Sequence, residues 1–362
     1  MTINSLNELV SNLNQVNKPI IGIFPHMLVP IELLYAAGCH PITLCLGGND
    51  EMANIGTEYL TQATCPFARA TIGYFKENNA LYDKIEYLIG GNYSNGDLTA
   101  SEMIDIYLKP KLITIVFPTT SVDPAIEFFY GEIKNLKAKL ENIFDCKISN
   151  EDISSSIDKY NKMRALLKEI NNKKIENDSL NHVELQNLNY KAMILGPDLI
   201  IPELETILNN LEPNDAAGGK KVITTGSLLT LGDPFLDFLL ELDIDVIIND
   251  CDLGISFYER GIEKINDDPL KDLTNYYLKD TTSARMYPNE STIPRAINFY
   301  KKYQAKGIIN HVLKFCDPFV AHKAIFKSEM QKNDIPVLEI ERDYATNIGQ
   351  LKTRIEAFFE MI

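Results

Sequence analysis

Short apolar runs alternate with helix-like segments over the first third of the chain. Residues 18–24 form a run rich in isoleucine that ends just before a proline, which predicts a buried parallel strand. Residues 30–38 begin with proline, continue with helix-forming residues and end in glycine, as expected for a short helix. Further strands are predicted at 41–46, 87–89 and 112–117. Such alternation predicts a parallel sheet that is covered by helices on both faces.

The middle of the chain has a different pattern. Apolar residues recur at helical spacing in two stretches: Ile126, Phe129, Ile133, Leu136, Leu140 and Ile143, then Ile153, Ile157, Tyr160, Met163 and Leu167. We therefore expect a pair of long amphipathic helices between 125 and 174. Residues 171–181 are polar and are expected to form an exposed turn or linker.

Strand and helix patterns alternate again in the last part of the chain. Strands are predicted at 221–226, 244–249, 307–310 and 335–340, and a final helix at 349–361. The expected fold is α/β, with two doubly wound, flavodoxin- or Rossmann-like parallel-sheet lobes joined by long helices. The expected parts are an amino-terminal lobe (1–124), a helical bridge (125–200) and a carboxy-terminal lobe (201–362). The two lobes are expected to share their strand order.

The charge balance excludes several classes of partner. The 362 residues include 50 acidic and 35 basic ones, for a net charge of −15. An acidic surface repels nucleic acid and anionic membranes, so neither is an expected partner. No apolar run approaches the roughly 18 residues of a membrane span, and the first 15 residues lack a secretion signal, so a cytoplasmic location is expected.

Three of the six cysteines occupy positions suited to binding a metal. Cys251 and Cys316 follow predicted strands, and Cys65 precedes a proline at a predicted helix start. Ligands collect beyond the carboxyl ends of parallel strands, and a helix amino terminus favours the thiolate that iron requires. The spacing does not match ferredoxin or zinc motifs, so buried, inert cysteine remains the alternative. No dinucleotide fingerprint, Walker loop or hydrolase triad accompanies them.

Several segments, in order along the chain, resemble the 2-hydroxyacyl-CoA dehydratase and benzoyl-CoA reductase family. They are a Pro-x-Glu motif followed by Ala-Ala-Gly-x-x-Pro in residues 30–41, Cys65-Pro-Phe-Ala-Arg69, Lys314-Phe-Cys-Asp-Pro318, Glu341-Arg-Asp-Tyr344 and residues 349–358. The resemblance covers nearly the whole chain.

The resemblance implies an iron–sulfur enzyme subunit. Such subunits hold a [4Fe-4S] cluster through three cysteines and pair with a related second subunit or with a second copy. A separate ATP-hydrolysing iron–sulfur activator supplies one electron at low potential. The substrate is an (R)-2-hydroxyacyl-CoA, which loses water through a ketyl radical.

This sequence departs from the family at one cluster cysteine. The family's second cysteine follows the third strand, where this chain has Tyr93 and Ser94. The expected ligands are therefore Cys65 and Cys316, with Cys251 as the third. Glu32, in the Pro-x-Glu motif, is the candidate catalytic residue, although an acidic residue at a helix start is also favoured by the helix dipole alone.

Two alternatives follow from the missing cysteine and the cysteine count. One is a cluster-free partner subunit of the same fold. The other is a reductase of small molecules with a double-cubane cluster, although the lysine-rich stretch typical of that group is missing. Arg69, Lys314 and Arg354 are candidates for contacts with CoA phosphates, against the alternative of surface ion pairs.

Overall fold

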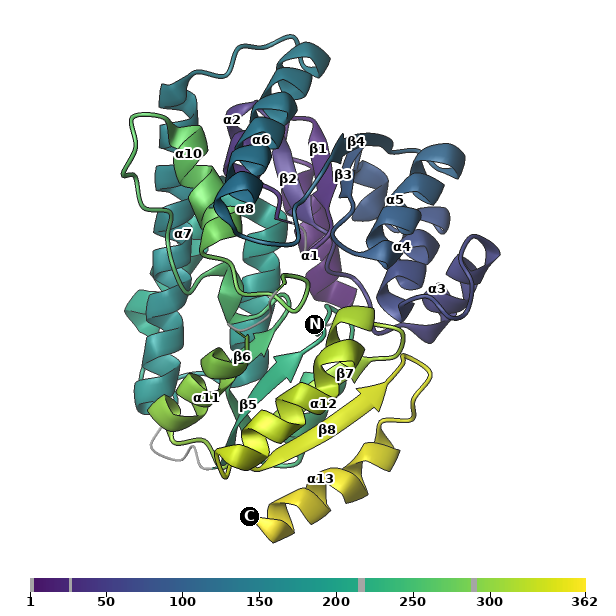
Figure 1. The fold of residues 1–362 in the computed structure, drawn as a ribbon, viewed down its shortest axis with the longest axis vertical. Helices are drawn as coiled ribbons and strands as arrows, with labels where there is room; N and C mark the ends of the chain where they lie inside the picture. The colour runs from purple at the N-terminus through teal and green to yellow at the C-terminus, as the bar shows by residue number, and fades with distance from the viewer. Residues whose placement is uncertain (1–2, 26–27, 214–218, 288–291) are drawn as a thin grey trace.

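The computed structural model describes residues 3–25, 28–213, 219–287 and 292–362, and it contains two four-stranded, wholly parallel sheets. In Figure 1 one sheet lies above the other, and long helices from the middle of the chain run along one side of the molecule. The α/β fold with two parallel-sheet lobes is thus confirmed.

The first lobe contains strands β1–β4 and the shorter helices between them. The strands are β1 (Ile20–Ile23), β2 (His40–Thr43), β3 (Tyr87–Gly91) and β4 (Lys111–Ile115). The helices are α1 (Ile3–Leu13), α2 (Ile31–Ala36), α3 (Asp50–Ile55), α4 (Pro66–Lys76) and α5 (Asn95–Tyr107), with short 3₁₀ turns η1 (Gly56–Glu58) and η2 (Tyr82–Lys84).

The bridge consists of α6 (Asp123–Ile143), α7 (Asn150–Asn177) and α8 (His182–Asn210). Helices α6 and α7 match the two predicted amphipathic helices. Helix α8 was not predicted, because its apolar residues are buried on most sides and its pattern is interrupted at Gly196 and Pro197, where the helix kinks. The exposed linker predicted at 171–181 is wrong for most of that range. Helix α7 continues through Asn177, and Lys174 is buried within it.

The last part of the chain contains strands β5–β8, which form the sheet of the second lobe. The strands are β5 (Lys220–Gly226), β6 (Ile244–Cys251), β7 (Gly307–Leu313) and β8 (Val337–Arg342). The helices of this part are α9 (Phe235–Glu241), α10 (Pro269–Thr274), α11 (Thr292–Tyr303), α12 (Asp317–Lys332) and α13 (Gly349–Met361), with a 3₁₀ turn η3 (Ile255–Phe257) and a π-helical turn η4 (Asn275–Lys279). Of these, α10 and η4 pack against the bridge helices, beside α6 (Figure 1).

Both sheets have the same strand order. The first is β2-β1-β3-β4 and the second β6-β5-β7-β8, so the order of strands within each lobe is second, first, third, fourth. The expected similarity between the lobes is therefore confirmed. In such sheets the crevice beyond the carboxyl ends of the strands collects ligands.

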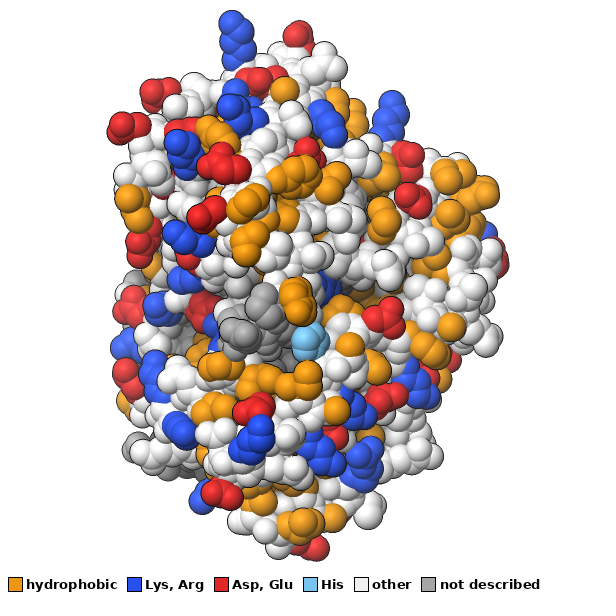
Figure 2. Space-filling model, viewed as in Figure 1, with side chains coloured by type: hydrophobic (Ala, Val, Ile, Leu, Met, Phe, Trp, Pro, Cys, Tyr) orange, Lys and Arg blue, Asp and Glu red, His pale blue; other side chains and the backbone are white. Residues whose placement is uncertain are grey.

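The exposed face seen in Figure 2 has a mixed charge. Lys and Arg side chains are spread among Asp and Glu and do not form one large basic surface. Among the described helices, none is long and apolar enough to cross a membrane.

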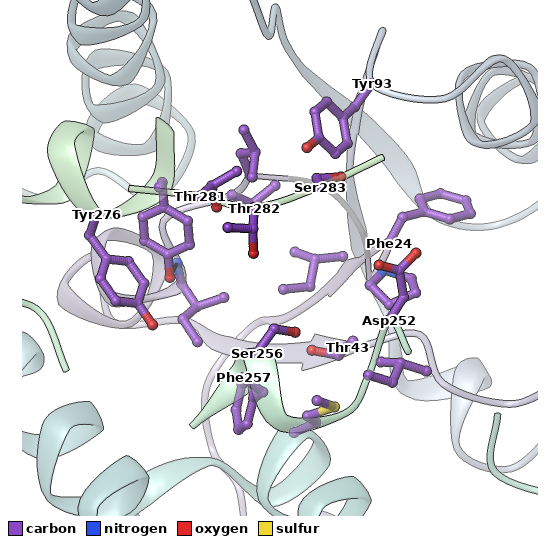
Figure 3. Close-up of a pocket in the computed structure, with 18 of the residues that line it drawn as sticks. Phe24, Thr43, Tyr93, Asp252, Ser256, Phe257, Tyr276, Thr281, Thr282 and Ser283 are labelled. Atoms are coloured by element: carbon purple, nitrogen blue, oxygen red, sulfur yellow. Dashed lines mark hydrogen bonds between the residues drawn. The ribbon is translucent and has the colours of Figure 1, made fainter. Parts of the chain in front are cut away.

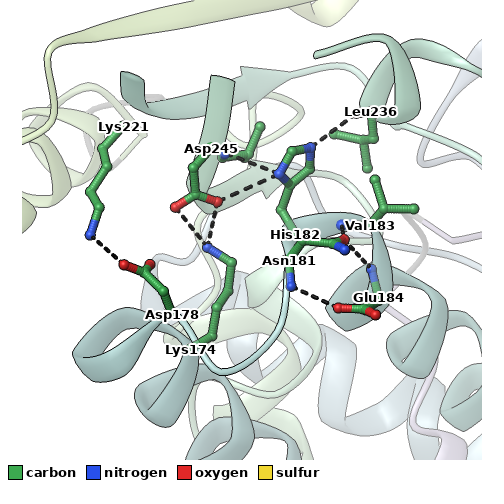
Figure 4. Close-up of polar contacts among 10 residues, drawn as sticks. Lys174, Asp178, Asn181, His182, Val183, Glu184, Lys221, Leu236 and Asp245 are labelled. Carbon is green, nitrogen blue, oxygen red and sulfur yellow. Dashed lines mark hydrogen bonds and ion pairs between the residues drawn. The ribbon is translucent and has the colours of Figure 1, made fainter. Parts of the chain in front are cut away.

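A buried polar network fixes the bridge to the second lobe (Figure 4). The Lys174 ammonium lies 2.8 and 3.1 Å from the two carboxylate oxygens of Asp245 on β6. His182, at the start of α8, lies 3.5 Å from the same carboxylate and bonds the Leu236 carbonyl. Burial opposes ionisation of Asp245, but the contacts with His182 and Lys174 outweigh it and lower the pKa of Asp245 to about 2.

This network gives the first testable prediction. Lys174→Met leaves the Asp245 carboxylate half-buried without its cation, so the free energy of unfolding should fall by about 3 kcal/mol at pH 6, measured by urea denaturation. The lowered pKa means that the ion pair stabilises the protein above the unfolded pKa of about 4 and stops doing so as the pH falls through the folded value. The difference between variant and wild type should therefore shrink at pH 3.

Lys168→Met, at an exposed position of the same helix, is the control and should change stability little. An equal loss of stability in both variants would contradict the prediction.

Candidate functional site

Two cysteines from different lobes meet between the sheets. Cys65 is the residue just before α4 in the first lobe, and Cys316 is the residue just before α12 in the second. The two thiols are close enough that each shifts the pKa of the other. Proline occupies the first turn of both helices, where its missing N–H costs no hydrogen bond. The same local sequence arrangement therefore places a thiol at each helix amino terminus.

The two cysteines line a cavity of about 360 Å³, here called the thiol cavity. A third helix, α5, also begins at this cavity, and Ser94 is the residue just before it. The amino termini of three helices thus surround one space. Each contributes unsatisfied N–H groups and a partial positive charge, so the cavity favours an anionic occupant.

A buried arginine, paired with a carboxylate, forms part of the cavity wall. Arg285 lines the thiol cavity, has a side chain that is 3% exposed, and pairs with Asp252 at 2.9 Å. Its guanidinium lies 5.9 Å from the ring centroid of Tyr93, which is also part of the wall. Together with the helix termini, Arg285 favours negative charge on the thiol sulfurs.

The two thiols differ in acidity. The hydrogen bond from Cys65 lowers the pKa of Cys316 against the effect of burial, and Arg285 and Ser227 act in the same direction. The same hydrogen bond, together with burial, raises the pKa of Cys65. The pair therefore loses its first proton readily, leaving a thiolate at Cys316 that accepts the S–H of Cys65.

Phe315 sets the backbone direction at Cys316. It has a φ of 60°, in the left-handed region that a bulky residue rarely adopts, and its side chain is 46% exposed at the cavity. Such a conformation costs on the order of 1–3 kcal/mol and persists only where surrounding structure imposes it. Here it turns the chain from the end of β7 into the start of α12.

A second, inner cavity of about 150 Å³ lies beside the thiol cavity (Figure 3). Apolar residues of the first lobe, such as Phe24 and Val29, line part of it. Hydroxyl-bearing residues from later in the chain line another part: Ser256, Tyr276, Tyr277, Thr281, Thr282 and Ser283. Among the residues that the structure describes, Tyr93 alone lines both cavities.

The structure places the predicted ligands in two different environments. Cys65 and Cys316 are brought together, as described above. Cys251 ends β6 and is buried in a separate apolar cluster with Val222 and Phe235, and it does not line the thiol cavity. Burial raises the pKa of Cys251 well above its usual value, which disfavours a free thiolate there. Its role as a third ligand stays a prediction.

Glu32 is fully buried in an ion pair. Its carboxylate lies 2.5 Å from the guanidinium of Arg164 on α7 and accepts a hydrogen bond of 2.8 Å from the hydroxyl of Tyr277. Glu32 lines neither cavity, although both of its partners line the inner one. The geometry gives it a part in positioning those partners, and its catalytic role stays a prediction.

The three basic residues considered for CoA phosphates line neither cavity. Arg69 is buried and donates to the carbonyls of Thr64 and Ala53, which holds the loop before α4. Lys314 pairs with Asp343 at 2.9 Å, and Arg354 donates to a backbone carbonyl on β8. These contacts are structural.

Sequence reasoning missed Arg285 and the Asp252 partner. Residues 280–287 carry no regular apolar pattern that would draw attention to them. Their position is fixed by tertiary contacts, such as the ion pair of Arg285 with Asp252. Asp252 directly follows β6. The expectation that functional residues lie just after parallel strands, which had singled out Cys251, therefore applied to Asp252 as well. Within the described residues, no group of three or more His, Cys, Asp or Glu side chains converges as a metal site.

Comparison with known proteins identifies the family. The model of the 2-hydroxyglutaryl-CoA dehydratase D-component family matches residues 26–362. The chain belongs to this family.

Relatives within the family match this chain along nearly their whole length. The beta subunit of (R)-2-hydroxyglutaryl-CoA dehydratase from Acidaminococcus fermentans is 25% identical, over 95% of this chain and 93% of the relative. The (R)-phenyllactyl-CoA dehydratase beta subunit from Clostridium sporogenes is 23% identical, over 99% and 96%. A benzoyl-CoA reductase subunit from Thauera aromatica is 22% identical, over 93% and 88%. The resemblance inferred from the sequence motifs is thus confirmed, and these relatives are named as subunits of larger assemblies.

The thiol pair of this family member gives the second prediction. In the iron-free, reduced protein, the rate of iodoacetamide labelling at Cys316 should rise with an apparent pKa below that of an ordinary thiol, about 8.5, followed by mass spectrometry from pH 5 to 9. Cys65→Ala removes the donated hydrogen bond and should shift the Cys316 profile to higher pH. Cys146, remote from the cavity and with a raised pKa, is the internal reference. Identical profiles at Cys316 and Cys146 would refute the assignment.

Proposed function

We propose that this chain is an iron–sulfur subunit of a 2-hydroxyacyl-CoA dehydratase, a lyase that removes water from an (R)-2-hydroxyacyl-CoA. The observation that carries the proposal is the meeting of Cys65 and Cys316 at two helix amino termini in one cavity between the lobes. The family membership supports the acyl-CoA substrate class.

The thiol cavity fits a [4Fe-4S] cluster in three respects. It contains a thiol pair with a readily formed thiolate, which is the form that ligates iron. It has three helix amino termini and Arg285 to balance the negative charge of a thiolate-bound cluster. It also has room beside the sulfurs, at about 360 Å³. The fit is incomplete in one respect, since only two thiols converge there among the described residues.

Ser94 lies at the third helix amino terminus that borders the cavity, and it carries a hydroxyl rather than a thiol. It precedes α5 as Cys65 precedes α4 and Cys316 precedes α12. Its hydroxyl makes no capping hydrogen bond. Ser94 is therefore the structural counterpart of the missing cysteine, with Tyr93 beside it. A hydroxyl is a weaker ligand for iron of this kind than a thiolate.

In the proposed reaction, the cluster supplies one electron and a Lewis-acidic iron when bound. Cys65 and Cys316 would hold it, and Arg285 would stabilise the negative charge around it. Tyr93 and the walls of the two cavities exclude bulk water from the space beside it. We propose that an ATP-hydrolysing iron–sulfur activator delivers the electron and that a related second subunit, or a second copy of this chain, completes the enzyme.

A cluster-free partner subunit is the second candidate function. It is favoured by the convergence of two thiols where the family has three. In that case the thiol cavity would be inherited from cluster-binding relatives, and the chain would contribute only its fold and its contacts to a partner.

Anaerobic iron and sulfide analysis distinguishes these candidates. The reconstituted wild-type chain should contain about four irons and four acid-labile sulfides per chain if it holds one cubane cluster. Cys65→Ala and Cys316→Ala should lose most of this iron. Cys146→Ala, at a half-buried thiol outside the cavity, is the matched control and should retain it.

The outcome at Cys251 tests the remaining ligand prediction. Cys251→Ala should keep its iron if the buried position beside Phe235 is structural. Loss of iron in this variant, with unchanged unfolding free energy, would instead make Cys251 a ligand. A wild-type chain that is fully folded but binds no iron would support the cluster-free candidate.

A gain-of-ligand variant tests the role given to Ser94. Ser94→Cys adds a third thiol at the third helix amino terminus, so it should slow the loss of iron to a chelator by about tenfold or more. Thr99→Cys, a residue of the same cavity wall one turn further along α5, is the control. Equal retention in both variants would mean that Ser94 has no special position.

A further inference from the structure

A second pair of cysteines meets in the structure, apart from the thiol cavity. The Sγ atom of Cys39 lies 3.9 Å from the carbonyl oxygen of Ala37, and the Sγ atom of Cys146 lies 3.8 Å from the same oxygen. Cys39 belongs to the first lobe and directly precedes β2, whereas Cys146 belongs to the turn between the bridge helices α6 and α7. Two thiols from different parts of the chain thus contact one acceptor, and neither lines the thiol cavity or the inner cavity.

The same backbone motif holds each of these cysteines in place. Beyond the end of α2, Gly38 has a φ of 78°, and beyond the end of α6, Asp145 has a φ of 47°. The residue after each left-handed residue is the cysteine. Its N–H donates to the carbonyl oxygen five residues earlier in the sequence, at 3.2 Å for Cys39 and 3.1 Å for Cys146. This hydrogen bond belongs to the Schellman motif that ends many helices, so the backbone of both cysteines is fixed.

The surroundings of the pair keep both sulfurs protonated. Burial, with a smaller contribution from Cys146, raises the pKa of Cys39 to about 12. Burial also raises the pKa of Cys146, and the nearby carboxylates act in the same direction. The charged groups around the two sulfurs are mostly acidic: Glu86, Glu141, Asp145 and Asp152, against Lys18 and Lys137. This pair is therefore the electrostatic opposite of Cys65 and Cys316, and it does not compete for a metal that requires thiolate.

The two cysteines differ in their access to solvent. The side chain of Cys39 is fully buried, whereas Cys146 is half-buried. A reagent in solution therefore reaches Cys146 first. Cys39 is placed behind it, where it can react with the sulfur of Cys146 and with no other cysteine that contacts Ala37 among the described residues.

We propose that Cys39 and Cys146 form a reversible disulfide that fastens the first lobe to the bridge under oxidising conditions. The oxidant is a small disulfide, such as glutathione disulfide. Cys146 loses its proton and attacks one sulfur of the oxidant, which forms a mixed disulfide and releases one thiolate. Cys39 then loses its proton and attacks the sulfur of Cys146, which releases the second thiolate. The two cysteines thus lose two electrons and two protons, and the oxidant becomes two thiols.

The disulfide would join two parts that are already in contact. Helix α2 packs against α7, where Arg164 pairs with Glu32 and the hydroxyl of Ser156 donates to the backbone carbonyl of Glu32 at 2.7 Å. A covalent bond between the turn after α2 and the turn before α7 would hold the same contact from its edge. In a reducing environment the pair stays as two thiols, and these non-covalent contacts act alone.

Peptide mapping tests whether the disulfide forms. The iron-free full chain is incubated with glutathione disulfide in the absence of oxygen, its free thiols are alkylated, and it is digested without reduction. Mass spectrometry should find a linked peptide that contains Cys39 and Cys146 and that disappears after treatment with dithiothreitol. Because both pKa values are raised, the rate of linkage should rise about tenfold per pH unit between pH 7 and 9.

Urea denaturation tests the fastening. It is measured in a Cys65→Ala/Cys316→Ala background, so that the thiol cavity contributes no cross-link. Oxidation should raise the urea midpoint by about 1 M, because the bond closes a loop of roughly a hundred residues in the unfolded chain. Cys146→Ser and Cys39→Ser should abolish the rise. Cys45→Ser, at a buried thiol of the same lobe outside the pair, is the matched control and should retain both the linked peptide and the rise.

Three outcomes would overturn the inference. A stable glutathione adduct on Cys146 with Cys39 still free would mean that the two sulfurs cannot meet. Absence of any modification at Cys146 would mean that the oxidant does not reach the pair. A complete cross-link that leaves the urea midpoint unchanged would mean that the bond fastens nothing.

Discussion

One buried ion pair joins three distant parts of the chain. Glu32 on α2 belongs to the first lobe, Arg164 belongs to the bridge helix α7, and Tyr277, which donates to the same carboxylate, belongs to the turn η4 that packs against the bridge. Three segments distant in the sequence are thus joined at one carboxylate that is fully buried. Removing one member would leave a charge or a donor unpaired in the interior, which is far more costly than an exposed ion pair. Because Arg164 and Tyr277 line the inner cavity, the junction fixes part of that cavity's wall.

The thiol cavity uses a repeated local device. A residue without helical geometry stands just before a helix whose amino terminus borders the cavity. Cys65, Ser94 and Cys316 occupy this place before α4, α5 and α12, and in the last two cases a strand (β3 or β7) precedes the residue. Since each helix terminus carries a partial positive charge, the three together create a site for an anionic group before any side-chain charge is counted. Arg285 then adds a full charge from a segment with no secondary structure of its own.

Tyr93 links the two functional spaces of the molecule. Among the described residues, it alone lines both the thiol cavity and the inner cavity. Its buried ring therefore faces the thiol pair on one side and the hydroxyl-bearing residues of the inner cavity on the other.

The sequence by itself determined the fold class, the family and the two cysteines that meet. The strand and helix patterns were strong because parallel strands buried on both faces are continuous apolar runs, and the proline after Cys65 and near Cys316 marks a helix start. The tertiary structure decided what no local pattern encodes. It extended α7 through the polar residues 171–177, because Lys174 finds a buried partner in Asp245. It also placed Cys251 in an apolar cluster, Glu32 in an ion pair and Arg285 beside the thiols, because burial and charge pairing depend on which surfaces meet after the chain has folded.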